Sequence, residues 1–112
     1  MGDRALIQLE ANGERSPVLY LHWGGSSVAG IIQRTQERMA DRPGDLSYIF
    51  ARMVGEAISE SPEGSTGFGV WNATEELTET DSQGDAGCFV VDVQNAVYVT
   101  RAFGGYGLTD KD

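Results

Sequence analysis

The 112-residue chain is 40% hydrophobic, which is enough for one continuous core and predicts a single domain over residues 1–112. Its one cysteine, Cys88, excludes an intramolecular disulfide, and no apolar run approaches the roughly 20 residues that span a bilayer. The start of the chain lacks the features of a secretory signal, so we expect a cytoplasmic protein that does not associate with membranes.

The first elements predicted along the chain are two strands that form an antiparallel hairpin. Residues 5–10 read as a strand, Asn12 and Gly13 as a tight turn, and residues 17–23 as the second strand. The glycine can adopt the positive φ that such a turn requires.

Two helices are predicted to follow. Ser26 or Ser27 is placed to cap the first helix, which should end near Pro43. Asp45 can cap the second helix, whose apolar residues recur at the i, i+3, i+4, i+7 spacing of one helix face. The apolar positions of the two helices are Val28, Ile31, Ile32 and Met39, and then Leu46, Ile49, Phe50, Met53, Val54, Ala57 and Ile58.

Three further strands complete the prediction. Residues 67–72 read as a strand, residues 73–87 as an acidic loop, and residues 88–93 and 97–103 as a closing hairpin. The order is β-β-α-α-β-β-β, which favours an α+β fold in which both helices cover one face of an antiparallel sheet of about five strands. Residues 104–112 are expected to form a flexible tail.

The distribution of charge is the most unusual feature of the sequence. The formal net charge is −9, and residues 53–100 contain nine acids and no lysine or arginine. Acids and bases cancel in the rest of the chain. Because charges of one sign repel one another, such a segment costs stability that a function could justify, although acidic surfaces also serve solubility alone.

An acidic surface is predicted from this segment. Glu56 and Glu60 are four residues apart on the second helix, and further acids follow in the loop. Carboxylates about 6 to 7 Å apart approximate part of the phosphate pattern of duplex DNA. The predicted partner-binding residues are Glu56, Glu60, Glu63, Glu75, Glu76, Glu79, Asp81 and Asp85.

Signals for catalysis and for metal binding are weak. One histidine, His22, and one cysteine do not make a zinc site, and no nucleophile and orienting acid can be named beside His22. Cys88 lies in an apolar run that is typical of a buried thiol. Gly24 and Gly25 before a helix outline an anion-binding turn, but an ordinary strand-to-helix turn looks the same. We therefore expect neither an enzyme, nor a metal, nor a cofactor.

Several short motifs resemble a family of small phage and mobile-element proteins. They are Gly-Asp-Arg-Ala from Gly2, Tyr-Leu-His-Trp-Gly-Gly from Tyr20, Phe-Ala-Arg from Phe50 and Phe-Gly-Val from Phe68. The size and charge are also similar to those of some type I-C anti-CRISPR inhibitors. That resemblance implies a counter-defence role, in which the inhibitor binds a CRISPR surveillance complex and in some cases mimics DNA.

The leading hypothesis is an anti-CRISPR-type inhibitor. It would act as a monomer, bind no nucleic acid itself, and place its acidic surface in the basic DNA-binding channel of a Cascade-type complex. The alternative is a phage accessory module that contacts a protein partner through an aromatic patch near Tyr20, His22 and Tyr106, without DNA mimicry. An enzyme that uses His22 as a base is a third hypothesis.

Overall fold

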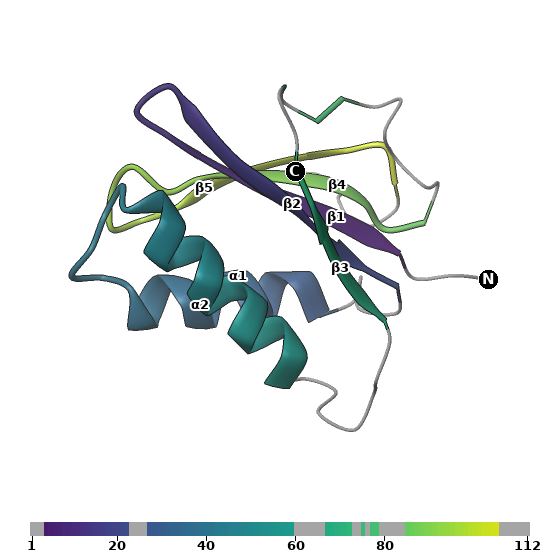
Figure 1. Ribbon diagram of the computed structural model, residues 1–112, viewed down its shortest axis with the longest axis horizontal. Helices are drawn as coiled ribbons and strands as arrows, with labels where there is room; N and C mark the ends of the chain where they lie inside the picture. The colour runs from purple at the N-terminus through teal and green to yellow at the C-terminus, as the bar shows by residue number, and fades with distance from the viewer. Residues whose placement is uncertain are drawn as a thin grey trace.

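The computed structural model shows a five-stranded sheet with two helices against one side (Figure 1). The residues that it describes are 4–22, 27–59, 67–72, 75, 77–78 and 85–105. The elements are β1 (Ala5–Ala11), β2 (Glu14–Leu21), α1 (Val28–Arg38), α2 (Leu46–Ser59), β3 (Phe68–Trp71), β4 (Gly87–Asp92) and β5 (Val99–Phe103). This order and the α+β class confirm the fold predicted from the sequence.

The first hairpin is closed by the predicted Asn-Gly turn. Asn12 and Gly13 have φ of 54° and 79°, and both values match the turn type that suits the right-handed twist of two antiparallel strands. The register shifts between Gln8 and Glu10 where β1 passes Ser16, whose hydroxyl accepts a hydrogen bond from the Leu9 N–H at 2.9 Å. β2 begins at Glu14, three residues earlier than predicted, and ends at Leu21, while Trp23 at the predicted end lies outside the described residues.

The strand order is β3-β2-β1-β4-β5, so β1 lies at the centre of the sheet. β1 pairs with β4 in parallel, whereas the other three pairings are antiparallel. The expectation of a purely antiparallel sheet is wrong at this one pairing. A parallel neighbour requires a crossover connection, and the chain between β3 and β4 supplies it. Leu77 of this connection is buried against the sheet face opposite the helices.

The main core lies between the sheet and the helices. Alternate residues of β1, among them Ile7 and Leu9, meet Ile31 of α1 and Met53 of α2 in one buried cluster. A smaller cluster on the opposite sheet face, called the back face below, contains Leu6, Val18, Leu77, Cys88 and Val90. Because both of its faces are covered, β1 is buried along almost its whole length.

The helix starts differ from the prediction in their capping. Ser27 occupies the N-cap position of α1, but its side chain makes no capping hydrogen bond, and Ser26 lies outside the described residues. The carbonyl of Asp45 accepts the first bond of α2, from the Ile49 N–H, while its carboxylate accepts a bond from Arg42 at 3.0 Å. Within the described residues, neither helix is long and apolar enough to cross a membrane.

Candidate functional site

Two exposed large apolar side chains of the sheet are neighbours on the edge strand β3, and a third, Val99, lies on β5 at the opposite edge. Val70 is 52% exposed and Trp71 is 46% exposed, which is high for large apolar residues. Trp71 pairs with Val18 in the register of β2 and β3, which places its ring on the back face. Val70 pairs with Leu19 and lies on the helix side of the sheet.

Trp71 is one member of an aromatic group. Its ring stacks on that of Tyr20, with centroids 5.8 Å apart and an interplanar angle of 30°. Tyr20 pairs directly with Gly69 across the β2–β3 ladder. The Tyr20 hydroxyl lies 2.6 Å from Nδ1 of His22, so the phenol and the imidazole hold each other in place. Tyr20, His22, Val70 and Trp71 are called the aromatic edge below.

The aromatic edge contains two of the three residues of the predicted aromatic patch. The structure brings Tyr20 and His22 together, while Tyr106 lies outside the described residues. Trp71 lies on a strand that the sequence predicts, but it is not among the predicted site residues. A signal was present in the sequence, because Trp71 is a large aromatic residue near the end of a short predicted strand, residues 67–72.

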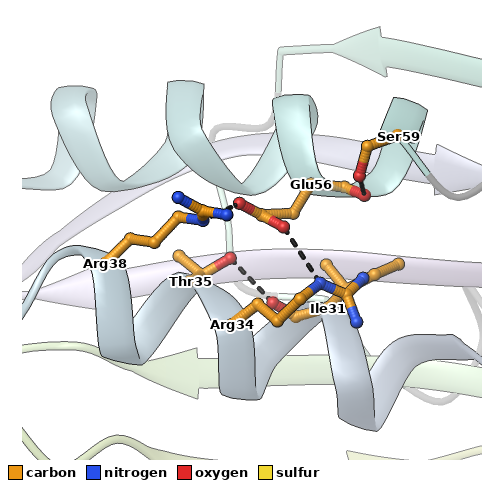
Figure 2. A network of polar contacts seen from close by, with 6 residues as sticks. All are labelled: Ile31, Arg34, Thr35, Arg38, Glu56 and Ser59. Atoms are coloured by element: carbon orange, nitrogen blue, oxygen red, sulfur yellow. Dashed lines mark hydrogen bonds and ion pairs between the residues drawn. The ribbon is translucent and has the colours of Figure 1, made fainter.

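Glu56 does not belong to an exposed acidic surface, and that expectation is wrong. Figure 2 shows its carboxylate on α2 facing Arg34 and Arg38 of α1. Nε of Arg34 is 3.0 Å from one carboxylate oxygen and Nε of Arg38 is 2.6 Å from the other, and only 6% of the Glu56 side chain is exposed. The hydrogen bond from Arg34 holds the pKa of Glu56 below its usual value of 4.5, so the carboxylate is ionised and neutralised in place.

Asp85 is similarly paired with an arginine from the first half of the chain. Its carboxylate accepts bonds from Nε of Arg4 at 2.6 Å and from the Arg4 backbone N–H at 3.2 Å, and 15% of its side chain is exposed. The bond from the Arg4 side chain lowers the pKa of Asp85. Asp85 thereby fixes the chain just before β4 to the residue just before β1, where the two strands begin their parallel pairing.

Glu75 is the one exposed acid among the predicted partner-binding residues that the structure describes. Its backbone carbonyl accepts a bond from Nε2 of Gln8 at 3.2 Å, while Oε1 of Gln8 accepts a bond from the Leu77 N–H at 3.0 Å. The fully buried Gln8 amide thus holds the backbone of this segment on the back face. The remaining predicted acids lie outside the described residues: Glu60, Glu63, Glu76, Glu79 and Asp81.

A second surface feature lies where α1 and α2 meet. An open hollow of about 520 Å³ is lined by Met39, Ser47, Tyr48, Ala51 and Arg52. Tyr48 is 56% exposed, and the guanidinium of Arg42 lies 4.1 Å from the centre of its ring. This cation–π contact fixes the tyrosine at the edge of the hollow.

The described residues offer little for catalysis. The His22 ring lies within hydrogen-bond distance of the Tyr20 hydroxyl, and a tyrosine hydroxyl is a weak nucleophile at neutral pH. Cys88 is buried, and its sulfur lies 3.7 Å from the Thr78 carbonyl. The described residues hold no group of three or more His, Cys, Asp or Glu side chains that could bind a metal ion. Comparison with protein-family models, with curated proteins and with solved structures finds no match.

Proposed function

We propose that this chain is a protein-binding module, without catalytic activity, whose aromatic edge contacts a protein partner. The observation that carries the proposal is the exposure of Trp71 on an edge strand while its ring is held by stacking on Tyr20. Tryptophan and tyrosine are enriched among the residues that dominate binding energies, because a rigid ring gains a large contact area at a low cost in entropy. Because the rings of Tyr20 and Trp71 are already ordered by stacking, less conformational entropy is lost on binding.

The resemblance to small phage and mobile-element proteins makes a host-cell protein the first class of partner to test. The chain would then be an accessory protein that captures a component of its host. The aromatic edge supports this proposal better than it supports an enzyme, because a base needs a nucleophile or a substrate cleft beside it.

The experiment uses the whole protein as bait and compares two single variants. A host protein retained by the wild type is purified, and its Kd is measured by surface plasmon resonance. Trp71→Ala should weaken binding about 30-fold, since a central tryptophan contributes about 2 kcal/mol or more. The matched control is Tyr48→Ala, which removes an exposed aromatic ring from the helix layer. Equal binding by the wild type and Trp71→Ala would contradict the proposal.

A second candidate is the anti-CRISPR-type inhibitor with an acidic, DNA-mimicking surface. It is favoured by the lack of lysine and arginine over residues 53–100 and by the exposure of Glu75. This candidate cannot include Glu56, because its carboxylate is buried against arginines. Asp85 is also largely buried, in an ion pair with Arg4. The candidate therefore rests on Glu60, Glu63, Glu75, Glu76, Glu79 and Asp81.

A further inference from the structure

The backbone of β3 has hydrogen-bonding groups that point away from the sheet. The His22 N–H donates to the Gly67 carbonyl at 2.9 Å, so these two residues form a hydrogen-bonded pair at the start of the β2–β3 ladder. In an antiparallel ladder, bonded and non-bonded pairs alternate. With the observed register, Gly69 and Trp71 therefore bond to β2, while the N–H and C=O groups of Phe68 and Val70 point outward.

β3 is short, with four residues, but its side chains offer none of the usual protection against strand pairing. Natural edge strands carry lysine, proline or inward-pointing charges that discourage another strand from pairing with them. β3 reads Phe-Gly-Val-Trp and has none of these residues. The strand at the opposite edge, β5, contains Arg101, which forms an ion pair with Glu10 at 3.2 Å. The two edges of the sheet thus differ in chemistry, and β3 is the one suited to accept a strand.

The charge of the surrounding sequence indicates what kind of strand would pair there. β3 lies within the stretch of residues 53–100, which contains no lysine or arginine and, besides Glu56 and Asp85 with their arginine partners, seven further acids. Glu75, four residues after Trp71, is exposed. A strand with flanking lysine or arginine residues would complement these charges, whereas a second copy of this chain would bring the same negative charges together.

We infer that the partner adds an extended strand to the outer edge of β3, and that this strand is apolar in its middle and flanked by basic residues. The inference rests on the proposed function and specifies how the partner binds. The N–H and C=O groups of Phe68 and Val70 would form the new ladder, since only an extended backbone presents donors and acceptors at a matching spacing. Side chains of the added strand would pack beside Val70 on one face and Trp71 on the other.

The direct test measures amide hydrogen exchange with a model peptide. The probe is a synthetic peptide of alternating valine and threonine with two lysines at each end. At a peptide concentration about ten times its Kd, most protein molecules hold a peptide whose backbone accepts hydrogen bonds from the Phe68 and Val70 amides. Exchange of these two amides should therefore slow by about tenfold. The Gly69 and Trp71 amides already bond to β2 and should change little. Unchanged exchange at Phe68 and Val70 at millimolar peptide would overturn the inference.

Two controls, one with a peptide and one with the protein alone, identify the occupant. The same peptide with glutamates in place of lysines should protect the amides of Phe68 and Val70 less. Equal protection by the two peptides would refute the inference that the added strand has basic flanks. A concentration series of the protein alone tests for a second copy. Protection of Phe68 and Val70 that rises with protein concentration would overturn the inference in favour of pairing between two copies.

A proline substitution separates this inference from the proposed function. Val70→Pro removes an N–H that points away from β2, so the β2–β3 ladder keeps its bonds, and proline is tolerated at such edge positions. Binding of the peptide and of the captured partner should fall at least as much as with Trp71→Ala, while Val70→Ala, which keeps the N–H, should bind more tightly than Val70→Pro. A thermal melt confirms that each variant is folded. Normal binding by Val70→Pro together with loss in Trp71→Ala would refute strand addition and leave the aromatic contact standing.

Discussion

At the scale of single residues, Glu56 shows that the role of an acid depends on what the fold places opposite it. Its spacing from Glu60 suggested an exposed ridge. It also lies three residues after Met53 and one before Ala57, on the buried side of α2. Arg34 and Arg38 are one helical turn apart on α1 and meet it there. The sequence shows which residues share a face on each helix. It does not show how the two helices cross, so it does not predict that Glu56 meets Arg34 and Arg38.

Replacing this acid should destabilise the protein in a pH-dependent way. Glu56→Gln keeps the shape of the side chain and removes its charge, so Arg34 and Arg38 lose their common anion. The pKa of Glu56 is lower in the folded protein than its usual 4.5, so its stabilising effect is complete above that value. The effect is lost as the pH falls below 4.5 through the lower folded pKa. Thermal melts should show a midpoint several degrees below that of the wild type near neutral pH, and the difference should shrink in acid.

The matched control for this prediction is Glu37→Gln. Glu37 is an exposed acid on α1 that accepts a bond from the Gln33 amide at 3.0 Å and has no arginine on its carboxylate among the contacts described. Its replacement should leave the melting midpoint almost unchanged at every pH, as expected for a solvated side chain. A Glu56→Gln protein with the midpoint of the wild type at neutral pH would show that the two arginines do not depend on the carboxylate.

At the scale of elements, the sequence predicts all seven helices and strands in the right order because each has a clear local pattern. The Asn-Gly turn joins β1 to β2, and the apolar positions of α2 follow the helical period. The parallel pairing of β1 with β4 has no local signal, since it depends on where the chain returns after β3. The aromatic edge is similar: Tyr20 and Trp71 are distant in sequence, and only the β2–β3 register stacks their rings.

The start of β4 depends on a glycine, and its replacement gives an element-scale prediction. Gly87 has φ of 105°, and a Cβ there would lie 2.6 Å from the Phe103 carbonyl oxygen and 2.8 Å from the Gly105 nitrogen. Gly87→Ala should therefore cost several kcal/mol, because it combines an unfavourable φ with a clash against backbone. Urea unfolding of Gly13→Ala supplies the comparison: its φ is 79°, but nothing lies within 4 Å of the added Cβ. That variant should lose only about 1 kcal/mol. Equal losses would show that the close approach at Gly87 is unimportant.

At the scale of the whole molecule, the positive and negative charges are only partly segregated. Two of the eight predicted partner-binding acids, Glu56 and Asp85, pair with arginines from the first half of the chain and hold the fold together. The other seven acids of residues 53–100 carry most, but not all, of the excess negative charge. Electrostatic binding through these acids is tested by reversing their charge in one variant and reversing an equal number of other exposed acids in a second.

The comparison uses two triple variants with the same net charge. Glu75, Glu76 and Glu79 are changed to lysine in one, and the exposed acids Glu14, Glu37 and Asp41 in the other, so both have a net charge of −3 instead of −9. If acidic mimicry of DNA operates, the first variant alone should lose inhibition of target-DNA binding by a purified type I-C surveillance complex. Inhibition by the wild type should also weaken as salt rises, because screening reduces attraction to a basic channel. Similar inhibition by both variants would contradict mimicry, since only a localised acidic surface distinguishes two proteins of equal charge.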